Sequence, residues 1–591
     1  MEPIISFKNY TFKYRAQTEP TLFGINLDIQ PGEKVLIIGH SGSGKSTIAH
    51  SLNALIPCSI KGEHTGSLTV AGKHPKEEGV FGMSRIVGTV LQDTDGQFVG
   101  MTVAEDLAFA LENDAVPQEE MFRRVDEAAA LVSMTEFLHH SPDELSGGQK
   151  QRVSLGGVLV DDVSVLLFDE PLANLDPATG KRTIALIDEI LHRKDLTVVI
   201  IEHRLEDVLY RDVDRIVVMS EGRIVADMAP DELLCTDVLR REGIREPLYV
   251  AAVNHALEAE AEAAAAKHAA ETEAAETVRR TIAPSDHPQH IETFRIEPYR
   301  RAVLDWFRAS PLPVRENHED VVLEVKDLSF SYNESRRVLQ DISFQIRRGE
   351  MVSIVGKNGA GKSTLASLIC GFYQPDGGSI FLNGEDIAPL SIMERGEKIG
   401  YVMQSPNQMI SKPMIMEEVG LCLQVRGVPE EEIRRRCAET LRVCGLYPMR
   451  NWPVGALSFG QKKRVSIASI LVMNPEIIIL DEPTAGQDYR CYTEIMEFLK
   501  DLNRRLGLTI LMITHDMHLM LEYTDRALVL ADGQLLTDDT PARVLTDPEI
   551  AERAYLKQTS LYDLALKCGI ERPYELVERF IDYERTEREK R

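Results

Sequence analysis

GHSGSGKST at residues 39–47 and GKNGAGKST at residues 356–364 decide the fold that we expect of this chain. Each stretch follows an apolar run, KVLIIG before the first and MVSIVG before the second, and each precedes a segment of helical character. Strand, glycine-rich turn and helix together form a phosphate-binding loop, because glycines let backbone N–H groups curl around phosphate oxygens and the helix N-terminus adds its positive dipole end. We therefore expect two phosphate-binding loops on two α/β domains.

The rest of the chain repeats as well. LSGGQKQR begins at Leu145 and LSFGQKKR at Leu457, which is 312 residues later, and we call these the signature octapeptides. The acidic pairs of VLLFDE and IIILDE, and the histidines of IIEHR and MITHD, have the same offset. The phosphate loops are 317 residues apart. The two repeats therefore differ by one insertion or deletion of five residues, which lies between the phosphate loop and Gln92 in the first repeat or Gln404 in the second. Such constancy indicates duplication of a whole domain.

Four segments follow from this repeat: a first domain at 1–245, a linker at 246–318, a second domain at 319–550 and a tail at 551–591. Asn254–Arg280 of the linker is rich in Ala and Glu and lacks Gly and Pro, so it predicts either a helix of about 40 Å or a solvated, partly disordered acidic tether. Prolines interrupt the remainder of the linker, where the apolar Ala302–Phe307 is expected to dock. The tail predicts short charged helices without an assigned task.

Bulk composition excludes several classes of protein. The 591 residues carry 66 Lys and Arg against 93 Asp and Glu, a net charge of −27 that disfavours a nucleic-acid partner. No run approaches the roughly 20 apolar residues needed to cross a bilayer, and the N-terminus lacks the pattern of a secretory signal. The eight cysteines form no C-x-x-C pair, which argues against zinc, iron–sulfur clusters and a disulfide framework. A reducing cytosol fits best.

The motifs themselves suggest a division of tasks. Lys45 and Lys362 would reach the β- and γ-phosphates, and the following Ser46 and Ser363 would hold Mg²⁺. An acidic pair at the carboxyl end of a strand lies where α/β folds place ligand chemistry. Asp169 and Asp481 would serve Mg²⁺, while Glu170 and Glu482 would polarise the attacking water.

The order of these motifs along the chain resembles that of the ATP-binding cassette (ABC) ATPases. The order is phosphate loop, glutamine, LSGGQ, Asp-Glu, a further aspartate and histidine. The resemblance covers both halves and implies an α/β fold: two P-loop NTPase cassettes in tandem, each a RecA-like core with an antiparallel β subdomain and a helical signature subdomain. In that family two cassettes pair head to tail, and ATP on one phosphate loop is completed by the LSGGQ segment of the other. Here the pairing would be intramolecular.

The resemblance implies two composite sites that bind ATP and Mg²⁺. The first would combine Tyr14, Gly39, His40, Ser41, Gly42, Ser43, Gly44, Lys45, Ser46, Thr47, Gln92, Asp169, Glu170 and His203 with Ser458, Gly460 and Gln461. The second would combine Tyr332, Gly356, Lys357, Asn358, Gly359, Ala360, Gly361, Lys362, Ser363, Thr364, Gln404, Asp481, Glu482 and His515 with Ser146, Gly147, Gly148 and Gln149.

The implied catalytic set is Glu170, Glu482, His203, His515, Gln92 and Gln404. The implied metal ligands are Ser46, Gln92, Asp169, Ser363, Gln404 and Asp481. Tyr14 and Tyr332 would stack on adenine, and Asp176 and Asp488 would lie where the cassettes meet.

Phe459 departs from the family pattern, which has glycine at this position. A Cβ hinders close backbone approach, but Ser458 and Gly460 are retained and both Glu170 and Glu482 are present. We expect two competent sites, and the sequence leaves open whether the one that uses Phe459 is the slower.

Three tasks are compatible with two such cassettes. Leu91–Asn113 resembles the corresponding segment of energy-coupling factor (ECF) ATPases, and residues from Met403 resemble it more weakly. That resemblance, which we favour, implies a peripheral motor at the cytoplasmic face of the membrane. Its partners would be a transmembrane scaffold subunit and a substrate-binding membrane subunit that import a vitamin, a vitamin precursor or a transition-metal ion.

The alternatives are a soluble tandem cassette protein acting on ribosomes and a cassette ATPase of DNA repair. The first would present a basic face to RNA, which the Glu/Ala-rich linker and the net charge of −27 oppose. The second would carry zinc-binding insertions, for which the sequence has no cysteine pairs.

Overall fold

The computed structural model describes residues 2–91, 95–172, 175–194, 196–269, 281–313, 319–333 and 336–590. Contacts within the chain divide it into two compact units. Unit 1 comprises Met1–Trp306 with Gly486–Arg490, and unit 2 comprises Phe307–Ala485 with Cys491–Arg591. Asp488 thus lies in a short segment that groups with unit 1.

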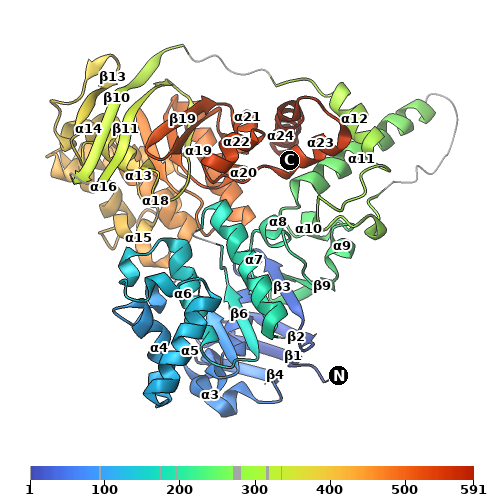
Figure 1. The fold of residues 1–591 in the computed structure, drawn as a ribbon. Coiled ribbons are helices and arrows are strands. Elements are labelled where there is room, and N and C mark those ends of the chain that lie inside the picture. The colour runs from blue at the N-terminus through green and yellow to red at the C-terminus, as the bar shows by residue number, and fades with distance from the viewer. Residues whose placement is uncertain are drawn as a thin grey trace. The chain divides into compact units, whose positions relative to one another are not determined.

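A six-stranded sheet forms the centre of unit 1 (Figure 1). Its order is β5 (Val87–Val90), β6 (Val165–Asp169), β7 (Thr197–Ile201), β3 (Lys34–Gly39), β8 (Arg215–Ser220) and β9 (Arg223–Met228). The first five strands are parallel and β9 is antiparallel to β8. Every residue of β3 and β7 is buried, as expected of a parallel sheet covered on both faces.

Two further layers complete the α/β part of unit 1. An antiparallel sheet has the order β2 (Leu22–Ile29), β1 (Ile5–Tyr14), β4 (Gly62–Val70). A helical group packs α4 (Val103–Asn113) against both α5 (Gln118–Leu131) and α6 (Gly147–Leu159). The other helices of this part are α1 (Lys45–Leu52), α2 (Leu55–Cys58), α3 (Pro75–Ser84), α7 (Pro177–Lys194), α8 (Leu205–Val208), α9 (Pro230–Leu233) and α10 (Val238–Arg241).

Unit 2 repeats this architecture. Its central sheet has the order β15 (Ile399–Val402), β16 (Ile477–Asp481), β17 (Thr509–Ile513), β12 (Met351–Val355), β18 (Arg526–Ala531) and β19 (Gln534–Asp539), again with only the last strand antiparallel. Its antiparallel sheet has the order β11 (Arg336–Arg347), β10 (Val321–Asn333), β13 (Gly377–Leu382), β14 (Glu385–Asp386).

The helices of unit 2 follow the same plan. They are α13 (Lys362–Cys370), α14 (Ile392–Lys398), α15 (Pro406–Met409), α16 (Ile415–Val425), α17 (Glu430–Val443), α18 (Phe459–Leu471), α19 (Tyr489–Leu506), α20 (Met517–Tyr523), α21 (Pro541–Leu545) and α22 (Pro548–Arg553). The prediction of two duplicated α/β domains, each with an antiparallel sheet and a helical group, is confirmed.

The linker begins with a helix, α11 (Leu248–Ala269), which starts before the predicted Asn254. Its first two turns are buried, and Tyr249 donates a hydrogen bond to the carbonyl of Pro288 at 2.5 Å. The second half of the predicted helix, residues 270–280, lies outside the described residues. The apolar stretch that was expected to dock forms α12 (Arg300–Ala309), with Ala302, Val303 and Trp306 buried.

The tail ends in α23 (Ser560–Cys568) and α24 (Pro573–Lys590), which Figure 1 draws in red, and α24 packs against α20, α21 and α23. The 18 residues of α24 are more than the short charged helix expected, and one face of this helix is buried through Leu576, Val577, Phe580 and Ile581. Arg585 donates to the carbonyls of Leu521 and Glu522 at the end of α20, so the tail is fixed to its unit. None of the helices in the described ranges combines the length and apolar character needed to traverse a bilayer.

Candidate functional site

The first glycine-rich loop leaves the carboxyl end of β3 in a conformation that only glycine adopts freely. Gly39 has φ 155° and a Cβ there would lie 2.3 Å from the carbonyl oxygen of Met219. Gly44, with φ 101°, precedes α1. Nζ of Lys45 donates to the carbonyls of Gly39 at 2.8 Å and His40 at 3.0 Å, and burial lowers the pKa of this ammonium. The lysine therefore holds the loop curled at the helix N-terminus.

Unit 2 builds its loop in the same way at the end of β12. Gly356 has φ 143°, and a Cβ would approach the carbonyl oxygen of Leu530 to 2.0 Å. Gly361, with φ 97°, precedes α13. Nζ of Lys362 donates to the carbonyls of Gly356 at 2.8 Å and Lys357 at 3.1 Å. Both loops thus offer backbone N–H groups and a lysine to an anion of phosphate size.

The two tyrosines predicted to meet adenine lie beside these loops. The hydroxyl of Tyr14 is 3.0 Å from Oγ1 of Thr47, and the hydroxyl of Tyr332 is 3.0 Å from Oγ1 of Thr364. The tyrosine rings are therefore tethered to the last residue of each loop. Stacking on a base stays a prediction.

Each catalytic glutamate candidate follows directly on a central strand and pairs with the predicted histidine. Oε1 of Glu170 is 2.6 Å from Nε2 of His203, and Oε1 of Glu482 is 2.7 Å from Nδ1 of His515. The two glutamates have φ 52° and φ 44°, a region in which non-glycine residues are strained. Their N–H groups donate at 2.9 Å to Ile201 and Ile513 of the adjacent strands, which holds the strained backbone in place.

The aspartates that precede them differ between the units. Oδ2 of Asp481 accepts hydrogen bonds from Tyr401 at 2.8 Å and from Ser363 at 3.3 Å, and burial raises the pKa of this carboxyl. In unit 1 the position of Tyr401 is held by Thr89. Burial, and then the charge of Glu170, raises the pKa of Asp169 to about 6.

These oxygen donors are of the kind that Mg²⁺ requires. A serine hydroxyl beside a carboxylate, as in Ser363 and Asp481, is a hard-oxygen donor set suited to this ion. Of the two glutamines predicted as further ligands, Gln92 lies outside the described residues, and Gln404 follows β15. The backbone carbonyl of Gln404 accepts a hydrogen bond from Nζ of Lys463 at 2.7 Å.

Both signature octapeptides form the N-terminus of a helix. Oγ of Ser146 accepts from the N–H of Gln149 at 3.4 Å, and Oε1 of Gln149 accepts from the N–H of Ser146 at 2.8 Å. Ser458 and Gln461 repeat this capping box at 3.3 and 3.0 Å. Phe459 is the first residue of α18 and its side chain is 40% exposed. The contact of either octapeptide with the opposite phosphate loop stays a prediction.

The glycines of the two octapeptides have different surroundings. A Cβ on Gly148 would lie 2.3 Å from Cγ2 of Thr179, whereas a Cβ on Gly460 would meet nothing within 4 Å of its own unit. Asp176, expected near the meeting of the cassettes, accepts from the N–H of Thr179 at 2.9 Å and from its hydroxyl at 2.8 Å. In unit 1 the start of α7 therefore packs directly against the signature helix.

Two buried ionisable residues beside the sites were missed by sequence reasoning. Lys463 is only 1% exposed, and its counterpart in the first octapeptide is Gln151. Glu202 is only 2% exposed and accepts from the N–H groups of Leu172 at 3.1 Å and His203 at 2.8 Å, and its counterpart is Thr514. Comparison of the two repeats, residue by residue, shows that both positions differ, but it does not show their burial.

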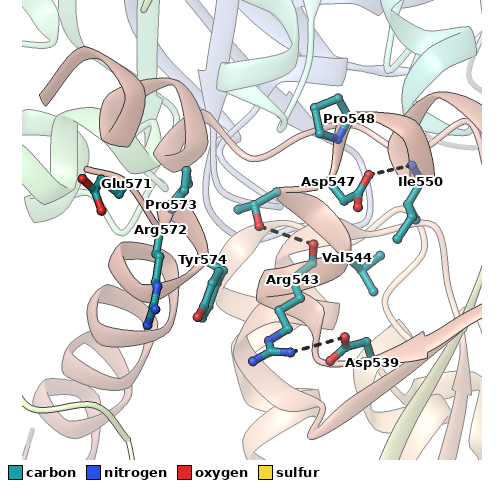
Figure 2. Close-up of a pocket in the computed structure, with 11 residues that line it drawn as sticks. Asp539, Arg543, Val544, Asp547, Pro548, Ile550, Glu571, Arg572, Pro573 and Tyr574 are labelled. Atoms are coloured by element: carbon teal, nitrogen blue, oxygen red, sulfur yellow. Dashed lines mark hydrogen bonds and ion pairs between the residues drawn. The ribbon is translucent and has the colours of Figure 1, made fainter. Parts of the chain in front are cut away.

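A separate cavity of about 440 Å³ lies in unit 2 between α21, α22 and the start of α24 (Figure 2). None of the predicted site residues lines it. Its charges serve the fold: Arg543 lies 3.8 Å from Asp539 and over the ring of Tyr574, and Asp547 accepts from the N–H groups that begin α22. The cavity therefore lies apart from the residues predicted to bind nucleotide.

Comparison with known proteins agrees with this geometry. The ABC transporter family matches residues 22–173 and 339–485. A Clostridium perfringens protein named as an ABC transporter ATP-binding protein is 53% identical over 585 residues, which is 99% of each chain. An Enterococcus faecalis protein named in the same way is 54% identical over 588 residues, also 99% of each chain. The solved structure of cbiO1 from Clostridium perfringens, part of the ABC transporter complex cbiONQ, is 35% identical, covers 42% of this chain and 100% of its own, and has a TM-score of 0.38.

The chain therefore belongs to the ABC transporter family, as an ATP-binding protein with two tandem cassettes. It binds and hydrolyses ATP, as this family does. Below, the first cassette is the one with the loop at 39–47 and the second is the one with the loop at 356–364.

Proposed function

We propose that the chain is the ATP-hydrolysing motor of a multi-subunit importer of the energy-coupling factor type. In this role it sits at the cytoplasmic face of the membrane and drives uptake of a vitamin, a vitamin precursor or a transition-metal ion through a scaffold subunit and a substrate-binding membrane subunit. ATP binds at two composite sites, and their closing and opening moves the membrane subunits.

The observation that carries this proposal is an exposed apolar loop between the glutamine position and α4 of the first cassette. In the first cassette Val99 and Met101 are exposed, Met101 to 82%, just before α4. The loop is held in shape by α4, because Asp106 accepts from the N–H groups of Val99 and Gly100 at 2.9 and 3.1 Å. A rigid loop that presents large apolar side chains to solvent is typical of a surface that another protein covers.

The second cassette holds the corresponding loop with the corresponding acid. Oε2 of Glu418 accepts from the N–H groups of Ser411 at 2.9 Å and Lys412 at 2.7 Å, and these residues lie 312 after Asp106, Val99 and Gly100. Trp452 is exposed near this loop, and its carbonyl accepts from the N–H of Ile415 at 3.2 Å. The same device in both cassettes supports docking of two cytoplasmic segments of the membrane scaffold.

Within each site the residues divide the work. The glycine-rich loops and their lysines bind the phosphates of ATP. Ser46 with Asp169, and Ser363 with Asp481, would hold Mg²⁺, which when bound would supply positive charge next to the phosphate oxygens. Glu170 and Glu482 orient and deprotonate the attacking water, and the paired histidines fix the direction in which each carboxylate points.

The docking proposal is tested by cell fractionation with candidate scaffold and substrate-binding membrane proteins co-expressed. The wild-type chain is expected in the membrane pellet only when they are present. The double variant Val99→Asp, Met101→Asp is expected in the supernatant with its ATPase activity retained. Leu566→Asp, which changes an exposed leucine on α23, is the matched control and is expected to bind normally. Equal membrane binding by both variants, or co-sedimentation of the chain with ribosomes, would contradict the proposal.

A further inference from the structure

Lys463 is a buried cation at the junction between the signature helix and the glutamine segment of the second cassette. It lies on α18, two residues after the capping Gln461. Its Nζ donates hydrogen bonds to the carbonyl of Met403 at 2.9 Å and to the carbonyl of Gln404 at 2.7 Å. One side chain therefore fastens the helix that begins at Ser458 to the segment that carries Gln404.

The charge on this side chain is compensated by the site itself. A buried ammonium is unfavourable unless carbonyl dipoles or carboxylates surround it. Two carbonyls accept its hydrogen bonds, and the charges of Asp481 and Glu482 favour the protonated form. The ammonium thus binds the glutamine segment through hydrogen bonds and is attracted electrostatically to the acidic pair.

In the first cassette, the described residues, which leave out 92–94, show a contact of the same helix with the segment after the acidic pair. Gln151 takes the position of Lys463, and its amide donates to the carbonyl of Pro171, which follows directly on Glu170. The amide oxygen of Gln151 accepts from Thr183 of α7 at 3.2 Å. The signature helix is therefore tied to the segment after the acidic pair in the first cassette, and to the glutamine segment in the second.

We propose that Lys463 is a positioning residue for ATP hydrolysis, which couples movement of the second cassette's signature helix to Gln404 and thereby sets that cassette's site apart from the first. The coupling is direct, because two hydrogen bonds from one charged group join the helix to consecutive carbonyls. The inference uses the ATPase activity of the chain and the assignment of Gln404 to the nucleotide site. It does not depend on which membrane partner the motor drives.

The test is Lys463→Gln, which places the first cassette's residue in the second. Lys462→Gln is the matched control, because it removes a lysine from the adjacent position of the same helix, outside the buried junction. Amides of residues 403–412 are expected to exchange with deuterium at least several-fold faster in Lys463→Gln than in the wild type, and at the wild-type rate in Lys462→Gln. Unchanged exchange in Lys463→Gln would overturn the inference.

Turnover is measured in a Glu170→Gln background, in which the second cassette's site is the active one. There, Lys463→Gln is expected to lower kcat about tenfold while KM for ATP stays within twofold. Lys462→Gln is expected to change neither. A fall in kcat equal in the two variants, or a rise in KM alone, would overturn the coupling role. A Glu170→Gln chain without turnover would contradict the two-site proposal instead, and deuterium exchange would then decide on Lys463.

A conservative variant keeps the test decisive if Lys463→Gln does not fold. Lys463→Arg retains the positive charge and several N–H donors. It is expected to keep more than half of kcat and wild-type exchange at 403–412. If Lys463→Gln does not fold, Lys463→Arg decides, because a tenfold loss of kcat in a folded arginine variant would contradict a role based on charge and hydrogen bonding.

Discussion

Oε1 of Glu170 lies 2.6 Å from Nε2 of His203, and the second cassette repeats this pair between Glu482 and His515 through Nδ1. An ionised carboxylate only accepts hydrogen bonds, so the histidine ring donates and fixes the orientation of the carboxylate. The pairs form although the two glutamates have strained backbones, which is typical of functional sites.

Loss of either histidine is therefore expected to slow hydrolysis more than it weakens ATP binding. His203→Ala and His515→Ala should each lower the turnover of their own site by roughly 10²-fold, the usual contribution of a well-placed acid–base pair. Phosphate release at saturating ATP measures this, and binding of ATP under non-hydrolysing conditions serves as the control. Histidine variants with unchanged turnover would show that the pairs are structural.

Both glutamates are expected to be needed for full activity. Glu170→Gln and Glu482→Gln keep the shape of the side chain and remove its ability to accept a proton, so each should abolish hydrolysis at its own site and leave the other working. The double variant should be inactive. Steady-state ATPase assays of the three variants check this. If one single variant keeps full turnover and the other has none, only one site is competent.

Phe459 is expected to slow the site that it helps to complete. Its side chain is 40% exposed at the first position of α18, where the first octapeptide has Gly147. Phe459→Gly should raise turnover in a Glu482→Gln background about two- to fivefold, which corresponds to under 1 kcal/mol of barrier. Gly147→Phe is the reciprocal variant and should lower turnover in a Glu170→Gln background. A fall in turnover in Phe459→Gly, or a rise in Gly147→Phe, would refute this role.

Removing the charge of Asp169 is expected to stabilise the chain in the absence of Mg²⁺. Its pKa is about 6 in the folded state, against 3.8 unfolded, so folding loses stability as pH rises through this window. Asp169→Asn should therefore raise the Tm at pH 7, and the gain in the free energy of unfolding should be at most about 3 kcal/mol. Near pH 4 the substitution should have no such effect. Thermal unfolding at the two pH values measures the difference. A variant that is less stable than wild type at pH 7 would contradict the assignment.

The tail is expected to contribute to the stability of the second cassette. Arg588 of α24 pairs at 2.9 Å with Glu522, which is only 4% exposed. Arg588→Met should destabilise unit 2 by about 3 kcal/mol, because a buried carboxylate loses its cation. Arg505→Ala is the control, since its pair with Asp501 is exposed and worth at most about 0.5 kcal/mol. Equal Tm values for both variants would refute this role of α24.

The duplicated fold and the positions of the site residues could be predicted because the motifs recur at constant spacing. These motifs are the glycine-rich loops, the acidic pairs and the histidines, which can be recognised in the sequence. The structure brings the glutamates and histidines within hydrogen-bonding distance. The burial of α24 was not predicted, because charged residues dominate its composition. Leu576, Val577, Phe580 and Ile581 nevertheless lie at helical spacing, and this signal was available.

Lys463, Glu202 and Tyr401 could not be predicted from motifs, since each differs between the two repeats. Their environments arise from packing between segments far apart in sequence, as when Tyr401 of β15 meets Asp481 of β16. Gln92 lies outside the described residues, so its role stays a prediction.

The unlike contacts of Gln151 and Lys463 have an evolutionary consequence. On the coupling role that we propose for Lys463, the two halves are no longer interchangeable parts, because each carries its own residue at this position. A chimaera built from two first halves, or from two second halves, would keep every motif and still lose the division of labour between them.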